Sequence, residues 1–202
     1  MEKTITPSEP ITEGQIGKLK ELLNAKLQKH KAELPSNLMQ QVLGIPELAD
    51  ELFAVIRKRV EAISDMIIRT VKVNRNRSAK EALKATGRAQ YVDDSVVKAM
   101  PNGEGEDTEV VFFKIGSQIS MDNLEKEYAL RGLKPADPFS LSAVNEADPA
   151  FADEHPNGTQ WKDKDGKWCY AFFDRDGDER YLVVDSLDDD WFDYWWFAGV
   201  RK

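Results

Sequence analysis

Cysteine and histidine are scarce in this sequence. Among its 202 residues, Cys169 is the one cysteine, and His30 and His155 are the two histidines. A single cysteine excludes a disulfide within the chain, and no cysteine or histidine cluster has the spacing of a zinc site. Neither histidine accompanies a serine or cysteine in a hydrolase motif. We therefore predict no metal site and no cofactor, a reducing compartment, and histidines that lie at the surface or cap a helix.

Long apolar stretches are also missing. No run approaches the ~18 to 20 residues that span a bilayer, and residues 1–10 are polar where a secretory signal would be apolar. The sequence thus predicts a cytoplasmic protein with no membrane span. Its apolar fraction of 41% beside 32% charged residues is typical of a globular chain and excludes disorder over the whole length.

The net charge of −8 is divided unevenly along the chain. Residues 1–100 carry 17 Lys and Arg against 13 Asp and Glu, a balance of +4, whereas residues 101–202 carry 11 against 23, a balance of −12. The run Pro-Asn-Gly-Glu-Gly at 101–105 separates them and has little preference for helix or strand. We expect a basic helical module over residues 1–100 and an acidic domain over residues 106–202.

Helical patterns fill the first half. Thr12 and Gln15 have the spacing of a capping box, and apolar residues then recur with a helical period up to Leu34. Residues 36–43 form a short second segment. A third pattern, over residues 47–73, predicts one helix of about 27 residues, ~40 Å long. Because so long an apolar stripe needs a partner helix, we expect this segment to pair within the chain or to join two copies in a homo-oligomer.

A basic segment spans residues 72–88. It contains six Lys and Arg against a single acid, Glu81. Such a segment could hold nucleic acid, or it could dock on the acidic half of the chain. Tyr91 is the one aromatic residue nearby that could stack on a base. The sequence therefore favours protein contacts over nucleic-acid binding. The six basic residues are Lys72, Arg75, Arg77, Lys80, Lys84 and Arg88.

The second half predicts an α+β domain. A continuous apolar run at 109–115 is typical of a buried strand, and helical patterns follow, the first capped by Ser120. The apolar period then changes to two, with Asp-Gly pairs in position for hairpin turns. The predicted order is one strand, two helices and then antiparallel strands to the C-terminus. The helices are expected at 120–130 and 138–145, the later strands at 159–161, 167–173, 180–185 and 194–201, and the turns at 165–166 and 176–177.

This order, and the closing run Trp-Trp-Phe-Ala-Gly-Val-Arg-Lys at 195–202, resemble the compact C-type-lectin-like fold. That form is shared by formylglycine-generating enzymes and by the variable proteins of diversity-generating retroelements. The likeness covers about residues 107–202. The stretches 130–137 and 161–168 also resemble an uncharacterised group of bacterial proteins. In the variable proteins, solvent-facing side chains near the C-terminus change freely on a fixed backbone, so the resemblance implies a variable binding surface on this domain.

Departures from the related families remove other functions. Formylglycine-generating enzymes work through a cysteine pair, which this chain lacks. The Glu-Pro-Asn or Gln-Pro-Asp loop of calcium-dependent sugar-binding lectins is also missing. Asp174, Asp176 and Asp178 have the spacing with which a calcium loop begins, but Glu179 stands where that loop needs glycine. A hairpin turn therefore explains the three aspartates better than a metal site.

The candidate ligand-binding surface lies between Phe173 and Tyr194. If Leu182 and Val184 face the core, the alternation of a strand turns their neighbours outward, and Trp191 and Trp195 would fix the ends of the following segment. The predicted ligand-binding residues are Phe173, Asp176, Gly177, Tyr181, Val183, Asp185, Leu187, Asp189, Phe192, Asp193 and Tyr194.

Most of the other aromatic residues fit a core better than a sugar platform. We expect Phe192 and Tyr194 to be the exposed members, because the segment around them lacks clean alternation. The residues expected in the core are Trp161, Trp168, Tyr170, Trp191, Trp195 and Trp196.

Three classes of function stay open. The leading hypothesis is a non-enzymatic recognition protein with a macromolecular ligand, specifically a protein. The alternative is a structural or regulatory protein in which the acidic half packs on the basic segment, with no variable surface. An enzyme is the least favoured class, because nothing in the sequence selects one catalytic pair among its 36 acidic residues.

Overall fold

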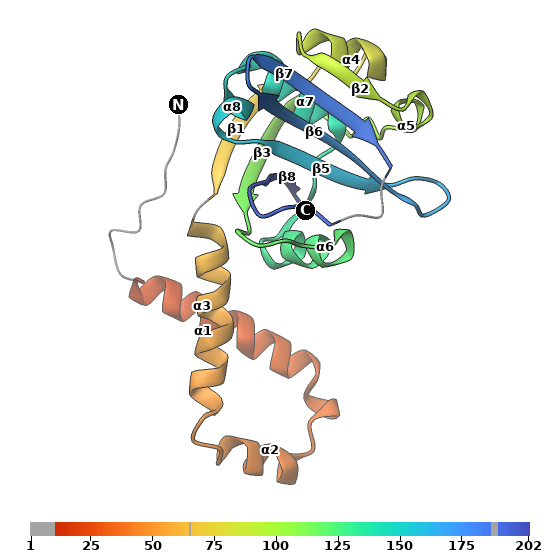
Figure 1. Ribbon diagram of the computed structural model, residues 1–202. Coiled ribbons are helices and arrows are strands. Elements are labelled where there is room, and N and C mark those ends of the chain that lie inside the picture. Colours follow the sequence, from red (N-terminus) through yellow and green to blue (C-terminus); the bar gives the residue numbers. More distant parts are fainter. Residues whose placement is uncertain (1–10, 65, 187–189) are drawn as a thin grey trace. The chain divides into compact units, whose positions relative to one another are not determined.

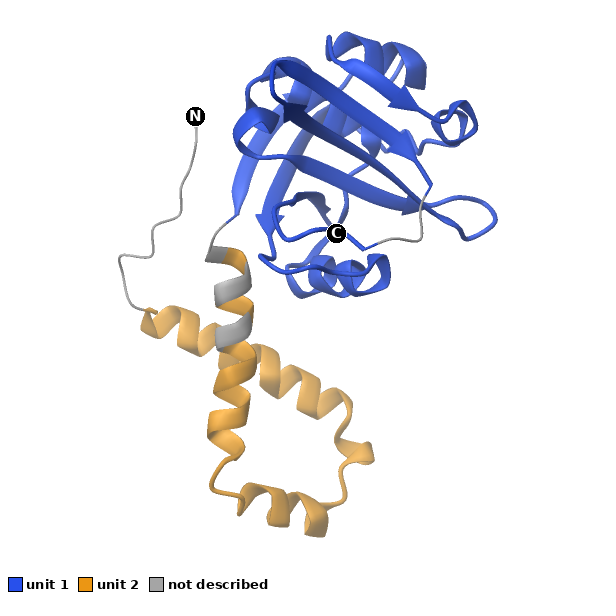
Figure 2. Cartoon of the chain, in the orientation of Figure 1, with its two compact units in different colours: residues 1–4, 65–202 blue, residues 5–64 orange. Residues whose placement is uncertain are grey.

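The computed structural model describes residues 11–64, 66–186 and 190–202 (Figure 1). The chain divides into two compact units, with the division after Ser64 (Figure 2). Residues 66–100 thus belong to the same unit as the acidic half, and the division differs from the boundary expected at 101–105. The physical reason is a strand at 67–72 that pairs with a strand of the acidic half.

Unit 2 of Figure 2, which the structure describes from residue 11 to Ser64, is helical. The capping box of Thr12 and Gln15 is confirmed, with the Gln15 amide donating to Thr12 Oγ1 at 3.3 Å and the Thr12 amide donating to Gln15 Oε1 at 2.9 Å. The first helix ends at Lys29, before the expected Leu34, and His30 caps it. The segment expected at 36–43 is confirmed as a helix. The elements are α1 (Glu13–Lys29), the 3-10 turn η1 (Lys31–Glu33), α2 (Ser36–Leu43) and α3 (Leu48–Ser64).

The single helix expected over residues 47–73 is wrong. Helix α3 ends at Ser64, and β1 (Ile67–Lys72) pairs antiparallel with β3 (Asp107–Lys114). Four of the six residues in β1 are branched at Cβ, and such side chains suit a strand packed between neighbours better than a helix. The apolar stripe beyond Ser64 therefore belongs to the sheet and does not extend a helical surface.

Unit 1 of Figure 2 is built on a mixed sheet, so the α+β class is confirmed. Its strand order is β1-β3-β8-β5-β6-β7-β2, and β4 pairs with β8. The last strand does not extend the antiparallel meander, because it inserts between β3 and β5 and lies parallel to β5. The remaining strands are β2 (Ala89–Val92), β4 (Leu133–Pro135), β5 (Asn157–Lys162), β6 (Trp168–Asp176), β7 (Glu179–Asp185) and β8 (Trp196–Arg201).

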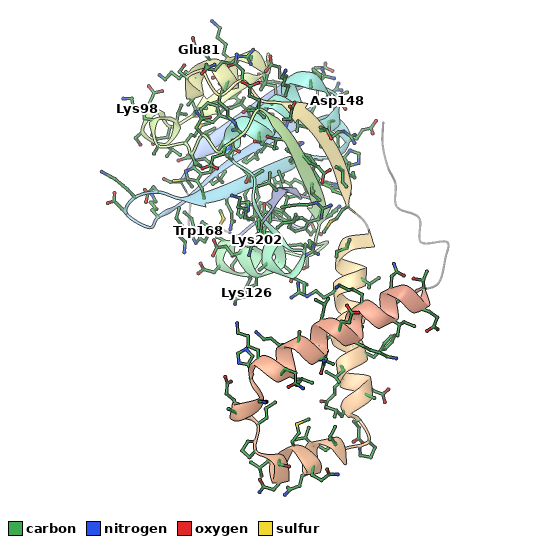
Figure 3. The ribbon with its side chains drawn as sticks, turned by 180° about the vertical axis from the view of Figure 1, so that it is seen from behind. Glu81, Lys98, Lys126, Asp148, Trp168 and Lys202 are labelled. Carbon is green, nitrogen blue, oxygen red and sulfur yellow. The ribbon has the colours of Figure 1, made fainter. Side chains whose placement is uncertain are left out.

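Helices cover both faces of this sheet. The expected helices are confirmed: Ser120 caps α6 by accepting a hydrogen bond from the Asn123 amide, and Asp137 caps α7 through the Ser140 amide. Trp168 lies beside α6, where its Nε1 donates to Asp122 Oδ1 at 3.2 Å; Figure 3 labels Trp168 together with Lys126 of the same helix. The helices are α4 (Ala79–Ala85), α5 (Asp94–Lys98), α6 (Met121–Leu130), α7 (Pro138–Ala147) and α8 (Phe151–Glu154).

The buried side chains form one core on each face. Helices α4, α5, α7 and α8 pack on the face that carries Phe112, Phe173 and Leu182. Helix α6 packs on the opposite face, together with Trp191 and Trp195. Strand β3 contributes alternate residues to the two cores, which is why its apolar run is continuous, as predicted.

The basic segment docks on the acidic half, as the sequence favours. Arg75 Nη1 lies 2.5 Å from Asp137 Oδ1, and Arg77 Nη1 lies 2.5 Å from Glu146 Oε2. Both carboxylates belong to the region of α7, one at its cap and one in its last turn. These pairs join the strand and helix at 66–85 to the acidic half.

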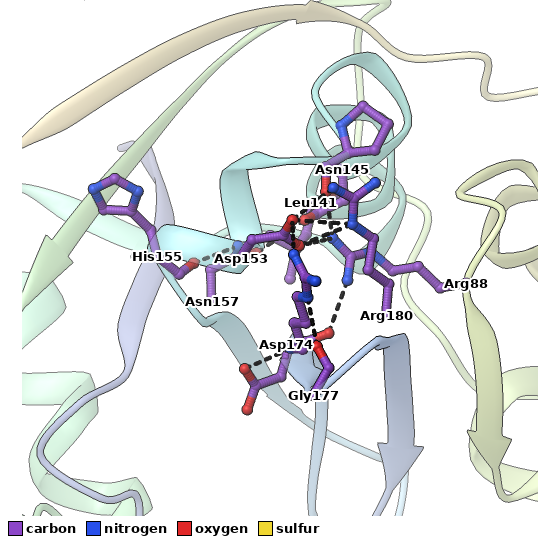
Figure 4. A network of polar contacts seen from close by, with 11 residues as sticks. Arg88, Leu141, Asn145, Asp153, His155, Asn157, Asp174, Gly177 and Arg180 are labelled. Carbon is purple, nitrogen blue, oxygen red and sulfur yellow. Dashed lines mark hydrogen bonds and ion pairs between the residues drawn. The ribbon is translucent and has the colours of Figure 1, made fainter.

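Arg88 is the most deeply buried cation of the segment, with a side chain only 1% exposed. It donates to the carbonyls of Pro149 and Asp174 at 2.8 Å and lies 3.9 Å from Asp153 Oδ1 (Figure 4). Burial lowers the pKa of Arg88, and Asp153 opposes that shift. Burial raises the pKa of Asp153, but its pairs with Arg180, Arg175 and Arg88 outweigh this and hold the pKa below its ordinary value.

We predict that Arg88→Ala destabilises the protein by about 3 kcal/mol, because it removes a buried side chain and takes from the carbonyls of Pro149 and Asp174 the donor that Arg88 supplies. Lys84→Ala is the matched control, since Lys84 is exposed in the same segment and should change stability by less than ~0.5 kcal/mol. Urea denaturation measures both. Equal midpoints for the two variants would contradict the structural role of Arg88.

Candidate functional site

One row of side chains from strands β6 and β7 lies on the face of the sheet that α6 covers. The antiparallel register pairs Phe172 with Val183 and Asp174 with Tyr181. The row on the other face includes Leu182 and Val184, which are fully buried. Leu182 and Val184 thus face the core, which is the condition on which the prediction that their neighbours face outward depends. The side chains that share the face of α6 are Tyr170, Phe172, Asp174, Tyr181, Val183 and Asp185.

Trp191 anchors the segment 190–195 to this face of the sheet. Its indole Nε1 donates to Gln160 Oε1 at 3.0 Å, and its backbone exchanges hydrogen bonds with Ile119 at 2.8 and 3.0 Å. A Cβ atom added at Gly158 would lie 2.7 Å from Cη2 of Trp191, so the strand admits the ring only because this residue is glycine. Trp195 packs its ring on Phe172, with 4.6 Å between centroids. Both tryptophans are buried, as predicted.

A cavity of about 270 Å³ opens between strand β6 and this segment. We call it the aromatic groove. Phe192 and Tyr194 stand at its border and are 58% and 42% exposed, as predicted. Their rings are nearly parallel, with 6.0 Å between centroids. The lining residues are Gln118, Met121, Tyr170, Phe172, Asp190, Trp191, Phe192, Tyr194 and Trp195.

One carboxylate, that of Asp190, lines the groove, and others lie near its tyrosines. The hydroxyl of Tyr181 donates to Asp174 Oδ2 at 3.3 Å. Burial and the charge of Asp174 raise the pKa of Tyr181 to about 12. Burial, Asp174 and Asp193 likewise raise the pKa of Tyr194. At another point of the lining, Gln118 Nε2 donates to Asp190 Oδ2 at 3.3 Å. This face therefore carries negative charge beside exposed aromatic rings.

The arginines of strands β6 and β7 lie on the opposite face of the sheet. Arg180 donates to both carboxylate oxygens of Asp153 at 2.6 to 3.0 Å, and Arg175 Nη1 lies 3.4 Å from Asp153 Oδ2. Figure 4 shows Arg180 converging with Arg88 on Asp153, which lies on α8. These arginines pair with Asp153 and not with the carboxylates near the groove.

Some of the predicted site residues lie elsewhere. Phe173 is fully buried and belongs to the core under α7 and α8, because the register places it opposite Leu182 on that face. Its prediction as a ligand-binding residue is wrong. Asp176 and Gly177 form the exposed end of the β6–β7 hairpin, where Gly177 has a φ of 56°, and they do not line the groove. Leu187 and Asp189 lie outside the described residues.

Sequence reasoning missed several residues of the groove. Tyr170 was expected in the core, yet it is half-buried and lines the groove with Phe172. Trp168, Tyr170 and Phe172 alternate along β6 and could have marked one aromatic face of that strand. No local pattern marks Gln118 or Asp190, which the fold brings to the groove from separate loops.

The cysteine and the two histidines have structural surroundings. Cys169 is buried, and that burial raises the pKa of its thiol, the opposite of what activates a nucleophile. His30 caps α1 and contacts Glu33 at 2.8 Å, while His155 caps α8 and stacks on Phe151. Within the described ranges, no three or more His, Cys, Asp and Glu residues gather where they could hold a metal ion.

No helix in the described part of the chain has both the length and the apolar character needed to cross a membrane. No family model, curated protein or solved structure matches this chain.

We predict that Gly158→Ala destabilises the protein by about 1 to 3 kcal/mol, because the added methyl overpacks the contact with Trp191. Gly17→Ala is the control: nothing lies within 4 Å of its Cβ position in α1, and alanine there should stabilise the helix by up to about 1 kcal/mol. Unfolding midpoints, with tryptophan fluorescence as the probe, distinguish the two. No loss of stability in Gly158→Ala would contradict the close contact.

Proposed function

We propose that the protein is a non-enzymatic recognition protein whose sheet domain presents a binding surface for another protein. The observation that carries this proposal is the aromatic groove with its two exposed rings, Phe192 and Tyr194. Aromatic side chains are enriched at protein interfaces, where they supply much of the binding energy. The surface comprises the groove together with Tyr181, Val183, Asp185 and Asp193.

The size of the groove supports a macromolecular ligand. Pockets for drug-sized molecules occupy about 300 to 1,000 Å³, whereas the groove encloses about 270 Å³. That volume suits one or two side chains of a partner better than a whole metabolite. The remaining contact area would come from the neighbouring strand face and from the exposed aromatic pair.

The construction of the surface also supports the finer proposal of a C-type-lectin-like variable protein. Helices α6 and α7 lie between β3 and β5 in the chain, as the resemblance requires. The segment 190–195 is anchored by its buried residues: Trp191, which packs on Gly158, and Trp195. Its exposed side chains therefore contribute little to the stability of the scaffold. A reverse transcriptase gene beside a near-copy of the DNA for residues 173–202, differing at template adenines, would establish this proposal, and its absence would count against it.

A second candidate, a structural or regulatory interaction protein, is favoured by the docking of the basic segment. Arg75, Arg77 and Arg88 all pair with carboxylates of the acidic half. This is the packing that the alternative requires. Under it, replacing Phe192 and Tyr194 would leave all partner binding unchanged.

The helical unit supports association between copies of the chain. None of its described side chains is buried, although α1, α2 and α3 carry many large apolar residues. Their side chains are 37% to 64% exposed, and a contact between two copies, which in a standard interface covers about 800 Å² per partner, would bury them. Each long helix carries charges of both signs, so a second copy offers complementary charges. The exposed set includes Leu19, Leu22, Leu23, Leu27, Leu38, Val42, Leu52, Phe53, Val55, Val60 and Ile63.

We predict that the chain is an oligomer and that the double variant Phe53→Asp, Val60→Asp dissociates it, because these residues lie on one face of α3 and are 61% and 62% exposed. Light scattering measures the mass, and Lys20→Asp on α1 is a control that should stay associated. A parent protein with the mass of one chain would contradict the proposal.

We predict that alanine variants separate the displayed residues from the scaffold. Phe192→Ala, Asp193→Ala and Tyr194→Ala should each change stability by about 0.5 kcal/mol or less, because their side chains are exposed. Replacing Leu182, Val184, Trp191 or Trp195 should cost about 2 to 5 kcal/mol by leaving a cavity. Denaturation midpoints test both groups. If the first three variants are as destabilised as the other four, the proposed binding surface does not exist.

A further inference from the structure

We propose that the aromatic groove binds a cationic side chain, an arginine or a lysine, of the partner protein. The inference rests on the proposed recognition function and adds the chemistry of the ligand. Its basis is the combination of aromatic rings, a carboxylate in the lining with others nearby, and a volume that fits one long side chain.

The rings approach the groove from different directions. Phe172 lies with its centroid 4.6 Å from that of Trp195 and 6.5 Å from that of Trp191, at interplanar angles of 50° and 72°. Tyr170 extends the row, with 5.7 Å between its centroid and that of Phe172. A cation within about 6 Å of an aromatic centroid is attracted by the negative ring face. Rings at such angles offer faces and edges together, so the methylene stem of the ligand can pack beside them.

Charge favours a cation over other ligands. Asp190 lines the groove, and the exposed Asp193 stands between Phe192 and Tyr194 in the sequence. Among the described residues that line the groove, none is a lysine or an arginine. The arginines of β6 and β7 pair with Asp153 on the opposite face of the sheet. A cationic side chain would supply the positive charge that this face lacks.

The same features disfavour the other ligands that aromatic rings bind. A nucleobase could stack on Phe192 and Tyr194, but its phosphates would approach Asp190 and Asp193. An acidic peptide meets the same repulsion. A neutral apolar side chain would fill the cavity but would supply no positive charge to Asp190 and Asp193.

Three peptide probes test the inference on the full chain: acetyl-Gly-Arg-Gly-amide, its citrulline counterpart and its glutamate counterpart. Citrulline has nearly the shape of arginine without the charge. The indole N–H resonances of Trp191 and Trp195, assigned with Trp→Phe variants, report binding. We expect saturable shifts with the arginine probe, a Kd about 10-fold lower than for citrulline, equivalent to about 1.4 kcal/mol, and weaker binding in higher salt.

Matched variants test the role of the carboxylates. Asp190→Asn and Asp193→Asn should each raise the Kd of the arginine probe several-fold. Asp165→Asn makes the same change of charge in the exposed turn between β5 and β6, outside the groove lining, and should leave the Kd unchanged. Unfolding midpoints confirm that all three variants are folded.

Each outcome decides between the two proposals. If the citrulline or glutamate probe binds as tightly as the arginine probe, the inference is wrong and recognition by the groove stands. Arginine binding that is unchanged in both Asp190→Asn and Asp193→Asn also overturns the inference. If no probe shifts either tryptophan resonance, both the inference and the proposed recognition by the groove are wrong.

Discussion

The groove depends on one packing constraint, the contact of Trp191 with Gly158. The sheet can accept the indole at this point only because glycine leaves room for it. Once seated, the ring donates to Gln160 and packs against Tyr170, Trp195 and Phe197. This contact fixes both the floor of the groove and the direction in which Phe192 and Tyr194 leave the surface. Burial of the tryptophans secures the backbone, so the exposed rings are available for binding.

The division of charge along the chain has a physical explanation in the fold. The basic segment neutralises carboxylates at the cap and last turn of α7 and on α8, through Arg75, Arg77 and Arg88. Arg175 and Arg180 add to the same face. Positive charge therefore gathers on the face of the sheet that α4, α5, α7 and α8 cover, while the groove on the face of α6 keeps its carboxylates. The uneven charge along the sequence thus corresponds to a difference in charge between the two faces of the sheet. This difference is the basis for proposing a cationic ligand.

Local signals predicted much of this fold. Capping residues such as Thr12 and Ser120 act within one turn of a helix, so these helix starts could be predicted from the sequence. The alternation in β7 likewise placed Leu182 and Val184 in the core. Features that depend on distant partners could not be predicted. The strand at 67–72 has apolar positions that also fit a helix, and its pairing with β3, about 40 residues away, decides its conformation.

The groove itself was only partly predictable for the same reason. Phe172 and Phe173 are adjacent phenylalanines in β6. The register of β6 against β7 decides which of the two faces the groove. Gln118 and Asp190 reach the groove through the Ile119–Trp191 bridge, a contact between loops that local sequence does not encode. The exposure of Phe192 and Tyr194 was predictable, because their segment lacks the alternation of a buried strand.

Hydroxyl-radical footprinting of the full chain, read residue by residue with mass spectrometry, tests the central claim most directly, because the binding surface requires a particular phase of the strands. Phe192 and Tyr194, which are 58% and 42% exposed, should be oxidised rapidly, whereas Phe173, at 0%, should be protected until the protein unfolds. Trp191 and Trp195 should be protected as well, because they are 5% and 4% exposed. Rapid oxidation of Phe173, with protection of Phe192 and Tyr194, would contradict the account.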